Sequence, residues 1–195
     1  MNPSLKDQIR GALSRRQRTI VTDARLTKAG VLMPMYEDRN DLCVLFTRRS
    51  EEVTQHKGQI AFPGGCQHPD DPSLCATALR EAEEEIGLKS SDVEVLGELD
   101  DTATATTHFI VTPFVGFIPH PYAFRVNPDE IVELIPLPVR ILRDPAVFRE
   151  EQWDRDGASI PMYFYMVGSH VIWGLTARIL RQFLEAAFPD GAARR

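Results

Sequence analysis

Short apolar segments recur along the chain with the periods of β-strands. Residues 29–36 and 42–47 are apolar and β-prone, and the polar stretch EDRND between them reads as a turn, so the pair predicts a hairpin. Residues 93–99 (VEVLGEL) alternate as a half-buried strand does, and 109–118 predicts a more buried strand because it is rich in Val, Ile and Phe. Two further strands are expected at 131–137 and 162–167.

Three other segments repeat apolar residues every three or four positions, which predicts amphipathic helices over 4–14, 72–86 and 174–188. The central helix has clear end signals. Asp71 is expected to cap its N-terminus, Pro72 to be its first residue and Gly87 to end it in a left-handed conformation. Strands mixed with helices favour an α/β or α+β sandwich.

Composition and charge are those of a globular protein. The 195 residues, of which 43% are hydrophobic, are enough to bury a real core. No segment has the composition of a linker, so 1–195 is interpreted as a single domain with 1–28 as an N-terminal extension. The net charge of -6 without a basic block argues against nucleic-acid binding, and no apolar run approaches the ~20 residues of a membrane span. The oligomeric state stays open, a homodimer included.

Cysteines, histidines and tryptophans show no pattern of a metal or redox site. The cysteines are odd in number and lack CxxC spacing, which favours a reducing cytoplasm, and the mixed-charge N-terminus is no secretory signal. We therefore expect a cytoplasmic protein. Trp153 and Trp173 are interpreted as packing residues, and the histidines that lack partner spacing as structural: His68, His108, His120 and His170.

One side of the central helix collects negative charge. On helical geometry Glu81, Glu84 and Glu85 fall within roughly a 100° arc, away from the apolar stripe. Like charges three and four residues apart repel, so this face is costly unless something neutralises it. Hard divalent cations do so with oxygen ligands, and the glycine turn just upstream lets a backbone carbonyl approach. The alternative is a solvated acidic surface on which Arg80 pairs with Glu84.

The stretch ALREAEEEIGL, residues 78–88, resembles the core of the Nudix hydrolase signature, Arg-Glu-apolar-x-Glu-Glu-x-Gly-apolar, and FPGG at 62–65 stands where the family has its glycine turn. The resemblance implies a mixed β-sheet between helices, hydrolysis of a nucleoside diphosphate linked to another group, and a requirement for Mg²⁺ or Mn²⁺. It also implies roles for single residues: metal ligation by Glu81, Glu85 and the carbonyl of Gly65, further ligation or water activation by Glu84, orientation of a carboxylate by Arg80, and a late base or extra ligand in Glu130.

The chain departs from the family pattern before Arg80. Counting back from this arginine places Pro72 and Cys66 where the pattern has a glutamate and a glycine, because the loop is one residue longer. Asp70 and Asp71 are the candidates to replace the missing glutamate.

The upstream segment LFTRRSEEVTQHKGQIAFPGG, residues 45–65, looks like the second signature of the Nudix branch that cleaves coenzyme A, and HVIWGLTARIL, residues 170–180, is similar to that branch's closing helix. Coenzyme A carries a 3'-phosphate besides its diphosphate, so cationic side chains near the glycine turn would help to bind it. The candidate substrate contacts are Arg48, Arg49 and Lys57, with His56 and Gln59 as either substrate contacts or partners of the loop backbone.

The expected function is therefore the metal-dependent hydrolysis of coenzyme A, or of its derivatives, to 4'-phosphopantetheine and adenosine 3',5'-bisphosphate. One alternative is a Nudix pyrophosphatase for another nucleoside diphosphate derivative: ADP-ribose, a dinucleotide or an oxidised nucleotide. Another is a non-catalytic nucleotide-binding module. The complete Arg-Glu-x-x-Glu-Glu set favours an enzyme, because a binding module has no need of it.

Overall fold

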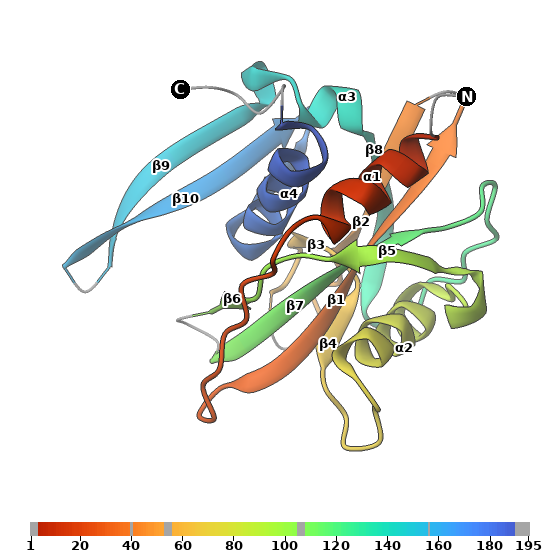
Figure 1. The fold of residues 1–195 in the computed structure, drawn as a ribbon, viewed down its shortest axis with the longest axis horizontal. Helices are drawn as coiled ribbons and strands as arrows, with labels where there is room; N and C mark the ends of the chain where they lie inside the picture. The colour runs from red at the N-terminus through yellow and green to blue at the C-terminus, as the bar shows by residue number, and fades with distance from the viewer. Residues whose placement is uncertain (1–3, 40, 53–55, 105–107, 156, 190–195) are drawn as a thin grey trace.

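The computed structural model describes residues 4–39, 41–52, 56–104, 108–155 and 157–189. Its main sheet has eight strands: β1 (Thr27–Asp38), β2 (Asp41–Arg49), β3 (Ile60–Ala61), β4 (Gly64–Cys66), β5 (Glu94–Glu98), β6 (Thr102–Ala103), β7 (Phe109–Phe117) and β8 (Ile131–Pro138). The central order is β3-β2-β1-β7-β5, with β4 paired to β1, β6 to β7 and β8 to β2 (Figure 1). β1 and β7 run parallel and β1 and β2 antiparallel, so the sheet is mixed.

A smaller antiparallel sheet has the order β11-β10-β9 and consists of β9 (Phe148–Arg155), β10 (Ala158–Val167) and β11 (His170–Trp173). The helices are α1 (Leu5–Ser14), α2 (Leu74–Ile86), α3 (Val139–Leu142) and α4 (Gly174–Ala187), with single 3-10 turns at Ser90–Asp92 and Pro145–Val147. Among the described residues, no helix is long and apolar enough to cross a membrane.

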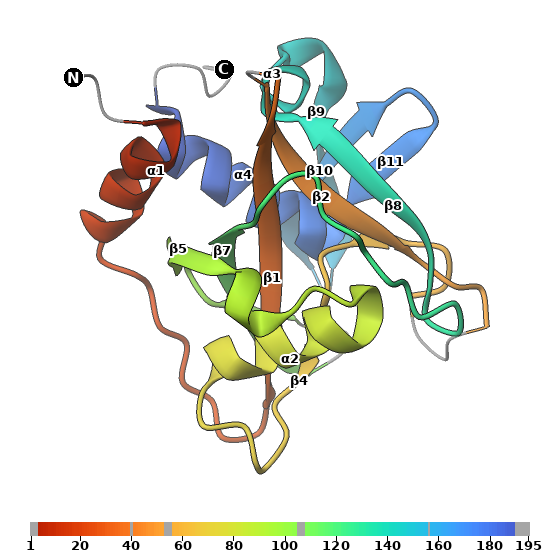
Figure 2. The ribbon, with the colours of Figure 1, turned by 90° about the vertical axis from the view of Figure 1, so that its right-hand side faces the viewer.

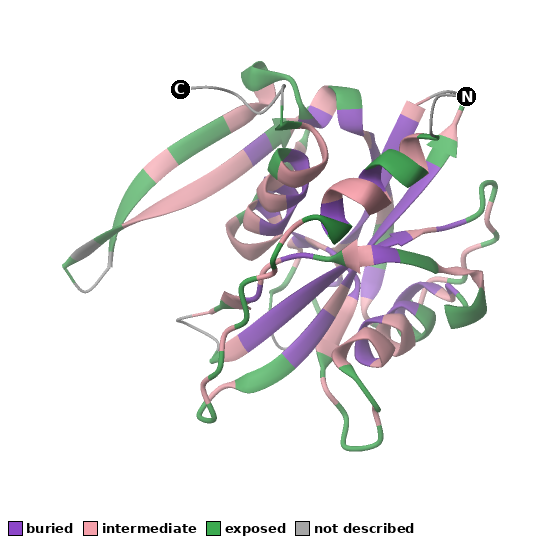
Figure 3. Cartoon of the chain, viewed as in Figure 1, coloured by how far each residue is buried: buried purple, intermediate pink, exposed green. Residues whose placement is uncertain are grey.

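Helices cover both faces of the main sheet (Figure 2). The side chains of β1 alternate between these faces, and both sets are buried. Leu32 packs with Ala82 of α2, whereas Met33 and Met35 pack with the apolar sides of α1 and α4. Figure 3 shows the buried residues along the central strands and on the inward sides of the helices. The predicted α/β or α+β class, with a mixed sheet between helices, is confirmed.

The predicted strands and helices all form, with ends that differ by a few residues. The segments predicted at 29–36 and 42–47 are the antiparallel pair β1 and β2, although residue 40 of their connecting turn lies outside the described residues. The elements that were not predicted are the short strands β3, β4 and β6, the helix α3, the strands β9 and β11, and the two 3-10 turns. β9 has the sequence FREEQWDR, whose many charged residues hide a strand that pairing with β10 stabilises.

The predicted start of α2 is wrong. Ser73, not Asp71, caps the helix by accepting a hydrogen bond from the backbone N–H of Ala76, and the helix begins at Leu74 rather than at Pro72. Asp71 does not cap because its carboxylate binds other groups, described below. The predicted end is confirmed, since Gly87 adopts a left-handed conformation with φ of 67°.

The segment 170–180, expected as part of a closing helix, contains both a strand and a helix. Val171 and Ile172 are β-branched and pair with β10 as part of β11. Gly174, with φ of 63°, then turns the chain into α4. Only the second half of the segment is therefore helical.

The N-terminal segment is part of the packed structure. α1 packs against α4 and β5, with its apolar side buried in the larger core cluster. The chain that follows is held by two neighbouring aspartates. Arg16 lies 2.8 Å from Asp100 and Arg18 lies 2.7 Å from Asp101. These contacts fix the segment along the edge of the sheet where β5 ends.

Close packing of α2 on β1 gives a test of the fold. A Cβ at Gly30 would lie 2.3 Å from the carbonyl oxygen of Leu74, so Gly30→Ala should push the helix away and lower the free energy of unfolding by roughly 1–3 kcal/mol. A Cβ at Gly11 in α1 would meet only the flexible side chain of Arg15, so Gly11→Ala should raise it by roughly 0.5–1 kcal/mol. Urea unfolding measures both, and effects of the same sign would contradict this packing.

Candidate active site

The carboxylates of α2 do not share one environment. Ala78, Ala82 and Ile86 pack into the sheet, and this orientation carries Glu85 inward as well. Glu85 is only 2% exposed, whereas the side chain of Glu84 is 55% exposed. The prediction that the glutamates lie away from the buried side of the helix therefore holds for Glu84 and is wrong for Glu85. Glu85 lies on the boundary of the apolar stripe, beside the loop between β7 and β8.

Arg80 holds the carboxylates of this site together. Its guanidinium lies 2.9 Å from Oε1 of Glu81 and 2.9 Å from Oε2 of Glu84. It also donates to the carbonyl oxygen of Cys66 at 3.2 Å, which ties the helix to the end of β4. The i,i+4 pair with Glu84 that the sequence predicted is thus present, as one of several contacts of the same group.

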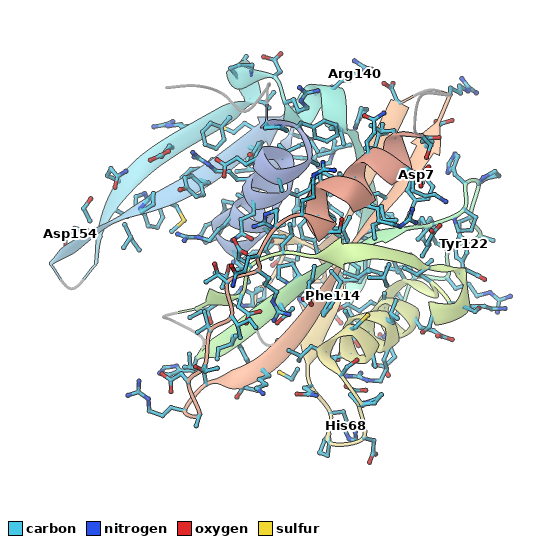
Figure 4. The ribbon with its side chains drawn as sticks, viewed as in Figure 1. Asp7, His68, Phe114, Tyr122, Arg140 and Asp154 are labelled. Atoms are coloured by element: carbon cyan, nitrogen blue, oxygen red, sulfur yellow. The ribbon has the colours of Figure 1, made fainter. Side chains whose placement is uncertain are left out.

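Asp71, one of the two aspartates named as candidates to replace the missing glutamate, binds Arg80. Its two carboxylate oxygens accept from Nε and Nη2 of Arg80, both at 3.1 Å, and Oδ2 accepts from the hydroxyl of Thr77 at 2.9 Å. Asp70 is exposed and faces His68, which Figure 4 shows at the outer end of the loop before α2. Of the two candidates, Asp71 is therefore the one that orients Arg80.

Arg49 at the end of β2 reaches Glu85 from the other side. Its Nη1 donates to Oε1 of Glu85 at 3.2 Å. Burial raises the pKa of the Glu85 carboxyl to about 8, although Arg49 acts in the opposite direction, and the nearby Glu81 and Glu130 raise it further. Burial also raises the pKa of Glu81. Both acids lie where a positive charge would favour their ionised form.

Glu130 is brought to these acids by the loop between β7 and β8. The carbonyl oxygen of Glu130 accepts from the backbone N–H of Ser50 at 2.7 Å, and the side-chain amide of Asn127 donates to Oε1 of Glu130 at 3.2 Å. The backbone N–H of Asn127 donates to the carbonyl oxygen of Glu85. The loop thus joins β2 to the end of α2, and it places a fourth glutamate near Glu81.

The donor set fits a hard divalent cation. Among the described residues, Oε2 of Glu85 is a buried oxygen with no hydrogen-bond partner. A Cβ at Gly65 would lie 2.5 Å from the carboxylate of Glu81, so only glycine lets the backbone approach this acid. In the part of the chain that the structure describes, no three acidic, cysteine or histidine side chains converge as a complete metal site, because Glu81 and Glu84 turn to Arg80. Oxygen ligands of this kind suit Mg²⁺ or Mn²⁺.

A cleft of about 1000 Å³ opens on the α4 side of the sheet. Its lining includes Gly65 and Arg49, which lie beside the carboxylates of Glu81 and Glu85. His56 and Gln59 line it and are joined by a hydrogen bond of 2.9 Å between Nδ1 and Oε1. The side chains of His56 and Gln59 therefore bind each other and also face the cleft. The other parts of the lining come from β1, β3, β4, β6, β7, β9, β10, β11 and α4.

Two of the predicted substrate contacts lie elsewhere. Arg48 donates to Glu133 at 2.7 Å and lies 2.9 Å from Nδ1 of His170, because neighbouring residues of a strand point to opposite faces. Lys57 is exposed, and neither cation lines the cleft. Arg49 is the member of the predicted trio that lies between the cleft and the carboxylates.

The tryptophans, interpreted as packing residues, are not part of the buried core. Trp153 and Trp173 line the cleft and are 43% and 37% exposed. Each belongs to a strand that the sequence did not predict. Without the strands, the alternation of side chains that would have placed both tryptophans on the same face of a sheet could not be applied. Asn127 was likewise missed, since its contact to Glu130 depends on the turn of its loop.

The Asp71–Arg80 pair predicts a pH-dependent loss of stability. Hydrogen bonds from Arg80 hold the pKa of Asp71 well below its ordinary value near 3.8. Because the folded-state pKa is the lower one, the stabilisation is present above about pH 4 and is lost as the pH falls through the folded-state pKa. Asp71→Asn should lower the Tm at neutral pH, and the difference from the unmodified protein should shrink towards about pH 2.

Asp70→Asn is the matched control, because its exposed carboxylate does not contact Arg80, and its Tm should follow that of the unmodified protein. Thermal unfolding of the three proteins across this pH range measures both. A Tm loss in Asp71→Asn that persists at low pH, or an equal loss in the control, would contradict the assignment.

Comparison with known proteins agrees with this geometry. The family model described as the NUDIX domain matches residues 26–155. An uncharacterized Nudix hydrolase NudL from Photorhabdus laumondii subsp. laumondii is 38% identical over 157 residues, which are 80% of this chain and 83% of that protein. A NudL from Yersinia pestis is 37% identical over 158 residues, covering 81% of this chain and 78% of that protein.

Two solved structures share the fold. A MutT/nudix family protein from Enterococcus faecalis has a TM-score of 0.51 at 14% identity, over 88% of this chain and 58% of that chain. An Ap4A hydrolase of C. elegans, in a binary complex, has a TM-score of 0.50 at 15% identity, over 59% of this chain and 82% of that chain. At these identities the likeness concerns the fold alone. The family model and the NudL relatives show that the chain belongs to the Nudix hydrolase family.

Proposed function

We propose that the chain is a divalent-metal-dependent diphosphatase that hydrolyses coenzyme A, or a derivative of it, to 4'-phosphopantetheine and adenosine 3',5'-bisphosphate. The observation that carries the catalytic part is the arrangement around Arg80 and the unpartnered buried oxygen of Glu85. A mere nucleotide-binding module has no need of several acids gathered at one end of a cleft. We further propose a cytoplasmic location, in keeping with the unpaired cysteines.

Glu81, Glu85 and the carbonyl of Gly65 would hold Mg²⁺ or Mn²⁺, which when bound neutralises the diphosphate charge and lowers the pKa of an attacking water. Arg80 keeps Glu81 and Glu84 in place, and Asp71 keeps Arg80 in place. Glu84 is exposed enough to meet water and accept its proton, and Glu130 is the second candidate for this step.

Coenzyme A is favoured over other nucleoside diphosphates by the segment 45–65, which resembles the signature of the branch that cleaves it. The position of Arg49 supports this choice, since it lies at the junction of the cleft and the carboxylates. ADP-ribose, dinucleotides and oxidised nucleotides share the diphosphate and remain the alternatives. A panel of these compounds, with Mg²⁺ or Mn²⁺ and products identified by mass, tests the proposal.

Loss of a metal-ligand charge should abolish most turnover. Glu81→Gln and Glu85→Gln should each lower kcat by at least about 100-fold, because each removes an anionic oxygen from the cation site. Glu83→Gln is the matched control: Glu83 points away from the site and accepts hydrogen bonds from Ser90, which a glutamine oxygen also accepts. Steady-state kinetics with Mg²⁺ measure all three variants, and near-normal turnover in both ligand variants would refute the metal assignment.

The role of Arg49 is tested by the 3'-phosphate. Coenzyme A and dephospho-coenzyme A differ only in this group, and a charge-assisted contact to it gives about a ten- to hundredfold preference in kcat/KM. Arg49→Ala should lower kcat/KM on both substrates, because Glu85 loses its partner, but should lower it further on coenzyme A. The ratio of kcat/KM values isolates the phosphate contact. An unchanged ratio would mean that Arg49 serves only Glu85.

A further inference from the structure

The beginning of α4 carries an arginine into the cleft. Arg178 lines the cleft, as do the residues that start the helix, 174–176. Ala177 and Leu180 are buried in the core, so the side chain of Arg178 leaves the helix on a different side. α4 lies beside β10 (Figure 1), and Nη2 of Arg178 donates to the carbonyl oxygen of Pro161 on this strand at 3.3 Å.

The guanidinium of Arg178 forms no ion pair with a carboxylate among the described residues. Its other contact is the ring of Tyr163, whose centre lies 5.7 Å from the guanidinium carbon. Arg181, one turn further along the helix, forms ion pairs with Glu150 at 3.0 Å and with Glu185 at 2.8 Å. Its guanidinium lies 4.4 Å from the centre of the same ring of Tyr163. The protein thus compensates the charge of Arg181 and leaves that of Arg178 uncompensated.

The other charged residues of the cleft do not supply the missing anion. Arg49 donates to Glu85, and His56 is hydrogen-bonded within its own loop. Asp154 also lines the cleft, but Figure 4 shows it near the outer end of the β9–β10 hairpin, and no ion pair joins it to Arg178. In the part of the lining that the structure describes, Arg178 is therefore the guanidinium left without an anion.

An uncompensated guanidinium in a cleft favours an anionic ligand. Arg178 is half-buried, so water screens its charge less than it would on an open surface. Its planar group can donate two parallel N–H bonds to a phosphate. The Pro161 carbonyl and the Tyr163 ring already hold the side chain, so less conformational entropy is lost when an anion binds.

This anion differs from the diphosphate that is cleaved. Gly65 and Arg49 line the cleft from the main sheet, beside the carboxylates, whereas Arg178 lines it from α4. A second anionic group also separates the candidate substrates. Coenzyme A carries a phosphomonoester on its ribose, and ADP-ribose does not. A phosphomonoester has its second pKa near about 6 and carries close to two negative charges at neutral pH.

We propose that Arg178 is a specificity-determining residue that binds a phosphomonoester group of the substrate, separate from the cleaved diphosphate. On coenzyme A this group is the 3'-phosphate. That identification rests on the proposed function, whereas the preference for a second phosphate rests on the unpaired cation of the cleft. Arg178 adds a contact from α4 to the one proposed for Arg49, whose guanidinium is partly taken by Glu85.

The test uses nucleotides that have no diphosphate to cleave. Calorimetry on the full chain with Mg²⁺ compares adenosine 3',5'-bisphosphate with AMP, which differ only in the 3'-phosphate. The bisphosphate should bind at least about tenfold more tightly, and Arg178→Gln should lower this ratio by about tenfold. A merely structural role of Arg178 would change both affinities equally, so the ratio reports the phosphate contact.

Arg181→Gln is the matched control, because Arg181 contacts the same ring of Tyr163 but does not line the cleft, and it should keep the ratio. Thermal unfolding verifies that each variant is folded. Equal affinities for the two nucleotides in the unmodified protein would overturn the inference. So would a ratio that survives in Arg178→Gln, or one that falls equally in Arg181→Gln.

Two further measurements separate this inference from the proposed function. If adenosine 2',5'-bisphosphate binds more tightly than its 3',5'-isomer and loses this advantage in Arg178→Gln, the phosphomonoester contact is retained and coenzyme A is overturned as the substrate. Turnover of coenzyme A with Mg²⁺ is measured in parallel. A preference for the bisphosphate that depends on Arg178, without hydrolysis of coenzyme A, would retain the inference and overturn the diphosphatase.

Discussion

The burial of the Glu85 carboxylate is the constraint on which the site depends. A helix that packs Ala82 and Ile86 into the sheet carries Glu85 to a place with almost no water, where an isolated negative charge is unfavourable. Arg49 compensates it in part, and the second carboxylate oxygen has no partner among the described residues. A bound cation would complete this compensation. The same side chain, Glu85, therefore affects both the stability of the fold and the chemistry of the site.

On the more exposed side of α2, Arg80 reduces the repulsion between neighbouring carboxylates. Acidic side chains three and four residues apart repel, and one guanidinium that contacts Glu81 and Glu84 reduces that repulsion. Asp71 then holds the guanidinium of Arg80 from the loop between β4 and α2, which is one residue longer than in the family pattern. In the proposed cation site, this arginine would have to share its carboxylates with the cation. The site thus pairs a fixed acid, Glu85, with two acids whose partner can change.

Local signals predicted much of this structure, and long-range contacts account for what they missed. Strong periodicity and β-prone composition located β1, β2 and α4, and Gly87 marked the end of α2 because a left-handed residue there favours glycine. The Arg-Glu-x-x-Glu-Glu spacing located the carboxylates. It did not locate the cap of α2, because only the fold shows that Asp71 is occupied by Arg80.

The cleft depended on strands that the local pattern hides. β9 is mostly charged, and β11 was interpreted as the beginning of a helix. Both segments form strands because they pair with β10. Arg48 and Arg49 are adjacent residues of the same type, but side chains alternate along a strand. Arg48 therefore contacts Glu133, whereas Arg49 contacts Glu85. Strand register decides which of two adjacent cationic side chains faces the site. The sequence of this segment alone does not specify the register.

The central claim, that the buried acid and its neighbours form a cation site, is tested most directly by binding of Mn²⁺ measured by electron paramagnetic resonance. The account predicts that the unmodified protein binds Mn²⁺, that Mg²⁺ displaces it, and that Glu85→Gln weakens binding by at least about tenfold while Glu83→Gln does not. Equal Mn²⁺ affinity of the Glu85→Gln variant and the unmodified protein would contradict it.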